Sequence, residues 1–366
     1  RRYETEHYNR DKEIILQLKN NHVFVKTFCG SILIEPWNVL GKQEQRLKVF
    51  TPYKNSLINN HTIAQPISTP KSLSLFKIKE SITLDDLKLR NESWMKKFEA
   101  KWNTGERFAL KKLDEFIHQN IDNYHLNRDM MSKDGTSKLS PHLNFGEISP
   151  KYIWNKIVKE DFSRISEGKK VFLSEVIWRE FAINLMLLYP NLNSKNMKTS
   201  FKNFIWINDH ENLKKWTFGK TGYPIVDAAM NQLWNIGWMH NRARMIVASF
   251  LTKHLLIPWQ WGADWFQDTL LDSNLASNYA SWQWVAGCGA DAAPYFRIFN
   301  PETQAIKFDP EGDYIKRYLP IFKKYDKKIC HTPNVSDLNL NYPKPIIDHK
   351  YARTRALKTL SKSKEN

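Results

Sequence analysis

The stretch WMHNRARM, residues 238–245, brings together residue types that can hold a ligand that is both flat and anionic. Arranged as a helix, it presents a ring, an amide, a guanidinium and a thioether on one face, from Trp238, Asn241, Arg242 and Met245. Such a face can stack on a planar group, hydrogen-bond its edge and pair with its phosphate. His240 and Arg244 lie on another face. The alternative is a packed helix end whose arginines reach water along their stems, and the residues alone leave both interpretations open.

The loop GTSKLS, residues 135–140, carries groups that favour a bound phosphate. The cation of Lys138 and several hydroxyls precede a helix that we expect to begin at Ser140-Pro141, with Ser140 as its cap. The first backbone N–H groups of such a helix have no helical partner and attract anions. The other hydroxyls belong to Thr136 and Ser137. An ordinary Ser-Pro helix cap explains the same pattern.

A third candidate segment, residues 271–301, surrounds two tryptophans and an amide with small side chains. Small residues near Asn278, Trp282 and Trp284 would let a flat group approach the backbone closely. Asp272 could neutralise one of the nearby arginines. A contact between two helices also uses small residues, so composition does not separate the two interpretations.

The composition is that of a globular protein with a basic surface. Of 366 residues, 42% are hydrophobic, and 55 Lys and Arg exceed 38 Asp and Glu to give a net charge of +17. This excess indicates a polyanionic partner such as nucleic acid, or else a Lys-rich solvated surface. Fourteen tryptophans favour stacking on bases or on an aromatic cofactor, beside ordinary core packing.

Several classes of protein are excluded. No apolar run approaches the roughly 20 residues of a membrane-spanning helix, and the amino-terminal residues lack a signal-peptide core. We therefore expect a cytoplasmic protein without a membrane partner. Three scattered cysteines, Cys29, Cys288 and Cys330, argue against a disulfide framework and against a zinc site of paired thiolates, so we expect no metal.

The elements that position these residues fall into three segments. Residues 1–58 indicate the end of an α/β domain, with a short helix at 13–20, strands at 22–28 and 31–36, and the run KVFTPYKNSL. Residues 59–91, which include AQPISTPKS, predict a linker. Residues 92–366 have helical periodicity almost throughout.

Three helices of the last segment have clear boundaries. Ser149-Pro150 provides a capping hydroxyl and a first-turn proline for the helix KYIWNKIVKE. The helix that begins near Pro224 ends at Gly237. The next helix contains WMHNRARM and stops before Pro258.

Four blocks of sequence resemble the flavin domain of the photolyase/cryptochrome family, most closely the class I cyclobutane pyrimidine dimer photolyases of bacteria. They occur in family order and are SEVIWREF, KTGYPIVDAAMNQLWNIGWMHNRARM, ASNYASWQWVAG and DAAPYFRIFNP. The resemblance implies a mainly α fold, with an all-helical FAD-binding domain preceded by an incomplete α/β (Rossmann-like) antenna domain. It also implies that photoexcited, reduced FAD gives an electron to a pyrimidine dimer flipped out of DNA, photolyases being among the enzymes that flip their target base.

The resemblance assigns residues to the flavin. The residues that match holders of the FAD phosphates are Tyr124, Thr136, Ser137, Lys138, Leu139 and Ser140. Further FAD contacts match Arg179, Trp238, Arg244 and Asp272. Asn278 matches the side chain beside flavin N5. Asn274 stands where the family often has Asp, so its contact with the flavin ring would come from an amide oxygen.

The resemblance also assigns an electron relay and a dimer pocket. The relay, from nearest the flavin to farthest, matches Trp282, Trp259 and Trp206. The pocket that receives the dimer matches Glu175, Trp178, Asn241, Arg242, Met245 and Trp284. Glu175 would hydrogen-bond the thymine edge, the tryptophans would flank the dimer, and Arg242 would serve the adjoining phosphate.

Three alternatives compete with repair of cyclobutane dimers in DNA by a monomer. A cryptochrome-like photoreceptor typically has Asp beside N5 or a long regulatory tail, and this chain has Asn278. A (6-4) photolyase has a histidine pair at the places of Asn241 and Met245. A flavin-free nucleic-acid binder would lack flavin absorbance. The family has a full antenna domain, of which this chain supplies only the last part, and this argues against a folate or deazaflavin antenna.

Overall fold

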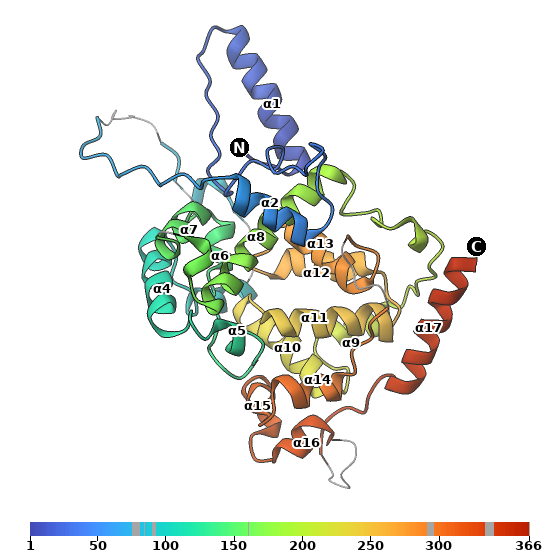
Figure 1. Ribbon diagram of the computed structural model, residues 1–366. Coiled ribbons are helices and arrows are strands. Elements are labelled where there is room, and N and C mark those ends of the chain that lie inside the picture. The colour runs from blue at the N-terminus through green and yellow to red at the C-terminus, as the bar shows by residue number, and fades with distance from the viewer. Residues whose placement is uncertain are drawn as a thin grey trace.

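The computed structural model describes residues 1–74, 81–83, 85–89, 93–159, 161–290, 296–333 and 340–365. Within these ranges the chain forms helices and no β-strand, and one isolated antiparallel bridge joins Leu40 to Arg46 (Figure 1). The prediction of a mainly helical fold is confirmed. The start of the block DAAPYFRIFNP, residues 291–295, lies outside the described residues.

The first half of the chain holds α1 (Thr5–Asn20), α2 (Phe50–Asn60), α3 (Lys96–Glu99), α4 (Glu106–Gln119), α5 (Tyr124–Asn127), α6 (Ser140–Asn144), α7 (Pro150–Ile157) and α8 (Glu167–Leu188). The second half holds α9 (His210–Thr217), α10 (Pro224–Ile236), α11 (Asn241–Ser249), α12 (Trp259–Thr269), α13 (Leu275–Ala286), α14 (Pro301–Phe308), α15 (Asp313–Tyr318), α16 (Lys327–His331) and α17 (His349–Glu365). Short 3-10 helices are η1 (Asp85–Leu87), η2 (Ser93–Met95), η3 (Phe162–Arg164), η4 (Thr199–Phe201) and η6 (Pro320–Phe322), and η5 (Phe250–His254) is a π-helical turn that continues α11.

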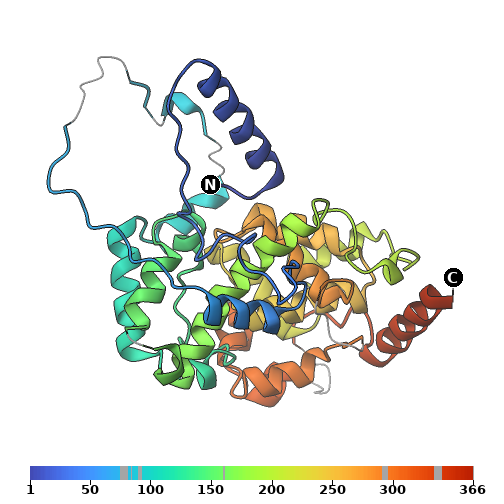
Figure 2. The same ribbon diagram turned by 45° about the horizontal axis from the view of Figure 1, so that its top comes forward.

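The amino-terminal segment differs from its prediction. The expected helix at 13–20 is the second half of α1, but the expected strands at 22–28 and 31–36 are absent, and the run KVFTPYKNSL forms most of α2. A strand is stabilised by hydrogen bonds to a neighbouring strand, and no such neighbour exists among the described residues. Phe24 is consequently 88% exposed. Figure 2 shows α1 and the segment after it standing away from the helical body. The predicted α/β character of residues 1–58 is therefore not found.

Local sequence signals set the boundaries of the helical body as predicted. The hydroxyl of Ser149 accepts a hydrogen bond from the Lys151 amide and caps α7. α10 ends at Gly237, whose φ of +64° is in the left-handed region. A Cβ at Gly237 would also lie 2.9 Å from the side chains of Leu271 and Phe98. Both the backbone conformation and the lack of space therefore require glycine at this position.

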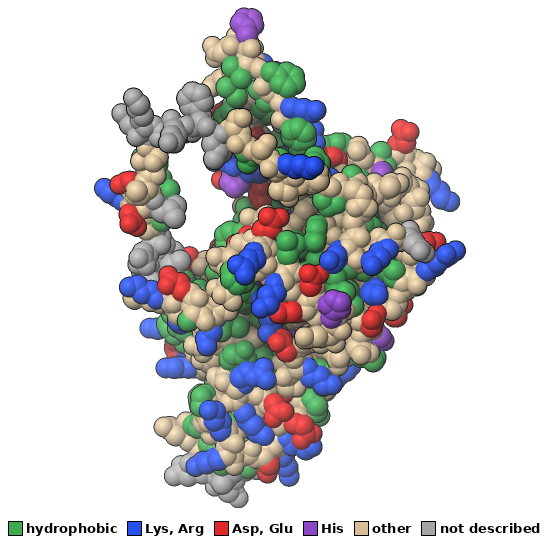
Figure 3. Space-filling model, turned by 90° about the vertical axis from the view of Figure 1, so that its left-hand side faces the viewer, with side chains coloured by type: hydrophobic (Ala, Val, Ile, Leu, Met, Phe, Trp, Pro, Cys, Tyr) green, Lys and Arg blue, Asp and Glu red, His purple; other side chains and the backbone are tan. Residues whose placement is uncertain are grey.

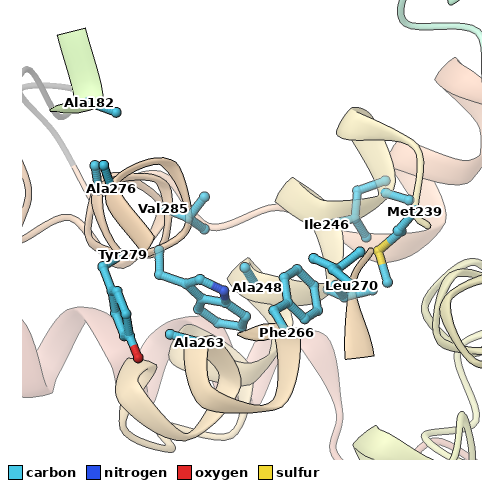
Figure 4. Close-up of a cluster of buried hydrophobic side chains, with 14 of the residues drawn as sticks. Ala182, Met239, Ile246, Ala248, Ala263, Phe266, Leu270, Ala276, Tyr279 and Val285 are labelled. Atoms are coloured by element: carbon cyan, nitrogen blue, oxygen red, sulfur yellow. The ribbon is translucent and has the colours of Figure 1, made fainter. Parts of the chain in front are cut away.

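The core is built around α8 and α13, two helices that are buried on most sides. α13 packs against α8, α11 and α12, and the close-up in Figure 4 shows Phe266 of α12 and Val285 of α13 within this cluster. Gly262 permits the close approach of α12, because a Cβ there would lie 2.1 Å from the Trp282 ring. The small residue that permits this contact belongs to α12, while Ala276, Ala280 and Ala286 of α13 are buried in a helix that packs against α8, α11 and α12.

Helix α8 also holds the amino-terminal segment in place through polar contacts. Glu180 accepts a hydrogen bond from the Leu33 amide at 2.8 Å, and Arg179 donates to the Ser31 carbonyl at 2.7 Å. Asn184 accepts two hydrogen bonds from the Arg46 guanidinium. Residues 31–47 are therefore anchored on the outer face of the same helix that reaches the centre of the molecule.

The described part of the chain lacks two kinds of feature. No helix there is both long and apolar enough to cross a membrane, and no group of three or more His, Cys, Asp or Glu side chains is placed to hold a metal ion. The three cysteines are free thiols, of which Cys288 and Cys330 are buried.

We predict that the contribution of Glu180 to the stability of the protein falls with rising pH. Burial raises the pKa of this carboxyl to about 8, although Arg179 and the backbone amides of the amino-terminal segment partly offset it. Between about pH 4.5 and pH 8 the unfolded chain ionises Glu180 and the folded chain does not, so the free energy of unfolding declines by up to about 1.4 kcal/mol per pH unit. Urea unfolding of the wild type and of Glu180→Gln at pH 5 to 8 measures this. The variant should lack that decline, and parallel curves for the two proteins would contradict the prediction.

Candidate functional site

A cavity of about 260 Å³ lies between α5, α6, α8, α11 and the start of α13. Its walls contain all the residues predicted to contact flavin except Asn278, together with Glu175 and Asn241 from the predicted dimer pocket. The flavin-side residues in the wall are Tyr124, Thr136, Ser137, Lys138, Leu139, Ser140, Arg179, Trp238, Arg244, Asp272 and Asn274. The fold thus gathers onto one cavity side chains that are up to 150 residues apart in sequence, from Tyr124 to Asn274.

The carboxylate of Asp272 is the centre of a polar network in the cavity wall. Its side chain is only 3% exposed, and it accepts hydrogen bonds from the Ser140 hydroxyl at 2.5 Å and from Arg244 Nη2 at 2.7 Å. Ser140 Oγ in turn accepts from the Trp238 indole N–H at 3.2 Å, and Arg244 Nε donates to the Met239 carbonyl at 2.8 Å. This network fixes three side chains from separate segments around one buried charge pair. The predicted ion pair of Arg244 with Asp272 is present.

The role predicted for Ser140 as a helix cap is wrong. Helix α6 has Leu139 at its cap position with no side-chain hydrogen bond. The Ser140 hydroxyl instead joins Asp272 to Trp238, donating to the carboxylate and accepting from the indole N–H. The loop before α6 has Lys138 at a φ of +50°, an uncommon conformation for a residue with a side chain, and its ammonium pairs with Asp134 at 2.7 Å.

The shared helical face predicted for WMHNRARM is also wrong in part. Helix α11 begins only at Asn241, so Trp238 precedes the helix and does not belong to its face. The start is set by His240, whose Nδ1 accepts a hydrogen bond from the Arg242 amide and caps the helix. Asn241 and Arg244 line the cavity, whereas Arg242 and Met245 are not among its lining residues.

His240 is held neutral by its surroundings. Burial lowers its pKa to about 4, against the opposing effect of the Asp129 carboxylate, and nearby arginines lower it further. A neutral imidazole is the form that can accept the capping hydrogen bond through Nδ1. His240, which had no role from the sequence, is therefore the residue that determines where α11 begins.

Asn274, which caps α13, and Asn278, which lies within α13, differ in their position relative to the cavity. Asn274 lines it, but its side-chain oxygen caps α13 by accepting from the Ser277 amide at 3.2 Å. Asn278 is 9% exposed and lies outside the cavity lining. Its amide nitrogen donates to the Ala263 carbonyl at 2.9 Å, which sets the orientation of the amide against α12. The interaction of Asn278 with flavin N5 stays a prediction.

The residues predicted to receive the dimer are only partly brought together. Glu175 and Asn241 line the cavity, while Arg242 lies beside it and donates to Asp129. Trp178 stacks on Phe50 of α2, with ring centroids 3.6 Å apart, so α2 covers one face of its ring. Met245 and Trp284 are half-buried and lie outside the lining.

Sequence reasoning missed two charged residues at this site, Arg128 and Asp129. Arg128 lines the cavity and donates a hydrogen bond to Glu175. Burial, the largest single effect, lowers the pKa of Arg128, but Glu175 together with Tyr124 and Asp129 outweighs burial and leaves the pKa raised. The signal was helical spacing, since Arg128 lies four residues after Tyr124 and its guanidinium stands over the Tyr124 ring at 5.5 Å.

The three tryptophans of the predicted relay lie at different depths. Trp282 and Trp259 are buried, at 2% and 0% exposure, and Trp206 is half-buried between two exposed isoleucines. Trp282 meets the edge of Phe266 at 5.1 Å, and the Trp259 indole N–H donates to Asn196 at 2.9 Å. Two buried tryptophans and a third that reaches the surface are compatible with a relay, whose order and function stay predictions.

Comparisons with known proteins identify the family. Residues 172–362 match the FAD binding domain of DNA photolyase. A deoxyribodipyrimidine photo-lyase of Agrobacterium fabrum is 44% identical over 98% of this chain and 77% of its own length. The crystal structure of a bacterial class III photolyase from Agrobacterium tumefaciens superposes with a TM-score of 0.95 at 43% identity, covering 100% of this chain and 79% of that one. Cryptochrome-2 of Arabidopsis thaliana is 31% identical over 97% of this chain and 62% of its own length.

The chain therefore belongs to the photolyase/cryptochrome family. Within that family it is an FAD-dependent enzyme of the photo-lyase type. The class I assignment stays a prediction, because the similar structure just described is a class III photolyase.

The cavity residues suit a flavin nucleotide. Hydroxyls and the Lys138 ammonium in the loop before α6 are suited to a diphosphate, and the buried indole of Trp238 offers a flat apolar surface. The guanidinium of Arg244, fixed on Asp272, supplies a preoriented N–H donor for a polar ring edge. These side chains are the ones we assign to holding the cofactor.

We predict that Asp272→Ala weakens FAD binding by at least about tenfold. The substitution removes the acceptor of Ser140 and Arg244 and leaves a guanidinium unpaired in the cavity wall. The ratio of flavin to protein absorbance after purification, and titration of the stripped protein with FAD, measure the loss. Asp264→Ala is the control, since this carboxylate accepts from Tyr279 and lies outside the cavity lining. Equal flavin retention by Asp272→Ala and wild type would refute the role of this network.

Proposed function

We propose that this protein uses light to repair cyclobutane pyrimidine dimers in DNA. The observation that carries the proposal is the presence of Glu175 and Asn241 on the same cavity as the flavin-side residues. A carboxylate and an amide at the mouth of a flavin cavity can hydrogen-bond the edges of a pyrimidine pair flipped out of the duplex. The cofactor supplies the chemistry, donating an electron to the dimer from its photoexcited reduced form.

The protein residues in this proposal bind, orient and exclude water. Arg244 and Asp272 would hold the flavin ring, and Glu175 would hydrogen-bond the dimer. Trp178, which packs one face of its ring on Phe50, would contact the dimer with the other face. Trp282, Trp259 and Trp206 would carry an electron inward from an external reductant at the surface and so return oxidised flavin to its reduced state.

The surface of the protein supports a DNA partner. The net charge is +17, and Figure 3 shows Lys and Arg side chains spread over one face of the molecule, with Asp and Glu between them. A basic surface of this kind gains affinity for a phosphate backbone by releasing counterions. Base recognition then depends on the cavity.

Two other activities of the family are less well supported. Asn278, which stands where plant cryptochromes carry Asp, favours repair over signalling. Asn241 and Met245, which stand where (6-4) photolyases carry histidines, favour the cyclobutane dimer. Both arguments depend on residue identity at matched positions.

The decisive experiment compares two lesions under blue light and in darkness. We expect the reduced holoprotein to convert cyclobutane dimers in DNA to monomers under light only, and to leave (6-4) products unchanged, as measured by chromatography of the digested DNA. Equal repair in darkness would refute a light-driven reaction. Repair of the (6-4) product alone would show that the substrate is the (6-4) product and not the cyclobutane dimer. Repair of neither lesion would favour a photoreceptor.

We predict that Trp282→Phe slows photoreduction of the oxidised flavin at least about tenfold and leaves repair by chemically reduced protein within about twofold of wild type, because it removes one relay step and no dimer contact. Absorbance changes under blue light and the repair assay measure the two rates. Trp154→Phe is the matched control, a buried tryptophan of α7 that stacks on Phe162 at 5.5 Å. Equal loss of both activities in Trp282→Phe would refute the relay assignment.

A further inference from the structure

Four charged side chains form a line of ion pairs beside the cavity. Arg128 donates a hydrogen bond to Glu175 through Nη1, and its Nε lies 4.0 Å from Asp129 Oδ1. Arg242 Nη2 donates to Asp129 Oδ2 at 2.6 Å. Carboxylates and guanidiniums alternate along this line, and its net charge is zero. The two residues proposed to meet DNA, Glu175 and Arg242, stand at its two ends.

Arg242 is thus a neutralised cation in the protein without DNA. Its guanidinium lies 4.2 Å from the centroid of the Phe308 ring, and its side chain is 16% exposed. Asp129, which holds it, is 35% exposed. Within the described residues, the buried Nε of Arg242 has no hydrogen-bond partner, so Asp129 supplies the anionic contact of this guanidinium. To reach a DNA phosphate, Arg242 must exchange Asp129 for it.

We propose that Asp129 determines specificity for damaged DNA by withholding Arg242 from phosphates until a base occupies Glu175. The inference rests on the proposed function. A base that hydrogen-bonds Glu175 competes with Arg128 for that carboxylate, and Arg128 keeps Asp129 as its other anionic neighbour. As Arg128 turns to Asp129, the Asp129 carboxylate pairs with both arginines and holds Arg242 less tightly. Arg242 is then released to the phosphate beside the lesion.

Binding of undamaged DNA does not release Arg242 from Asp129. Its bases stay in the duplex and leave Glu175 paired with Arg128, so Asp129 remains fully available to Arg242. A phosphate then has to displace Asp129 with no compensating change, and it is also repelled by the Asp129 charge. Because the side chains of all four residues are 16% to 35% exposed, the pairs are weak enough to exchange on binding. Asp129 is therefore a positioning residue that acts through Arg242.

The test is the variant Asp129→Asn, with binding measured in darkness to a duplex with one cyclobutane dimer and to the same duplex undamaged. We expect affinity for undamaged DNA to rise about threefold to tenfold, because one arginine becomes available to phosphate. The slope of log K against log salt for undamaged DNA should steepen by about 1. Affinity for the dimer-containing duplex should change less than twofold. The ratio of affinity for damaged DNA to affinity for undamaged DNA should therefore fall about threefold to tenfold.

Two controls separate this effect from a general gain of positive charge. Asp114→Asn makes the same charge change on α4, where Asp114 pairs with Lys156 at 3.1 Å and is 48% exposed. It should leave the affinity ratio and the salt slope as in wild type. In an Arg242→Gln background, Asp129→Asn should no longer raise affinity for undamaged DNA, since the arginine through which it acts is gone.

An equal rise in affinity for both duplexes in Asp129→Asn would overturn the inference. So would an effect no larger than that of Asp114→Asn, or an effect that persists in the Arg242→Gln background. Flavin content and thermal unfolding verify the fold of each variant, and Asp129→Ser replaces Asp129→Asn if the latter misfolds. A wild type that binds both duplexes equally would refute the proposed function itself. A wild type that discriminates, with an Asp129→Asn that discriminates equally well, would refute only the role of Asp129.

Discussion

The buried carboxylate of Asp272 is the constraint on which the cavity depends. One negative charge, almost wholly removed from water, is compensated by the Arg244 guanidinium and the Ser140 hydroxyl. An unpaired charge at this depth would be strongly destabilising, so α11 and α6 have to approach the segment before α13 closely enough to reach it. The same contacts fix Trp238, through Ser140, at the wall of the cavity. The contacts of Asp272 thus determine both how these helices pack and where the cofactor-binding groups lie.

Helix α8 connects this centre to the rest of the molecule. Its inner face offers Glu175 to the cavity, and its outer face holds the amino-terminal segment through Glu180 and Asn184. Arg179 belongs to both faces, since it lines the cavity and donates to the Ser31 carbonyl. A helix buried on so many sides shows little amphipathic pattern, and its polar residues are explained by individual hydrogen-bond partners instead of by exposure to water.

Features set by neighbouring residues were predictable from the sequence, and features set by distant partners were not. Ser149 and Gly237 mark helix ends by chemistry that acts within a few residues, and both predictions are confirmed. The strands at 22–28 and 31–36 had the right apolar pattern, but a strand also needs a neighbour, which a local pattern does not contain. The start of α11 was misplaced because His240 acts as a cap only when burial keeps it neutral.

The residues that the resemblance assigns to the flavin come together in the fold, and their contacts with flavin stay a prediction. Family motifs placed eleven of twelve flavin-side residues on one cavity, with Asn278 outside its lining. They gave no sign of Asp129, whose importance comes from its distance to Arg242 and not from its neighbours in sequence. An ion pair between residues that are distant in sequence can be identified only from the folded structure.

The polar contacts of α8 with residues 31–47 have a consequence for how the chain comes apart. The stretch from 61 to 74 has no regular structure and is largely exposed. If a protease cut the chain there, the amino-terminal piece would still be held by Glu180, Asn184 and Arg179, and by the stack of Phe50 on Trp178. The two pieces would stay together as a non-covalent complex. Continuity of the backbone and integrity of the cavity are therefore separable properties of this protein.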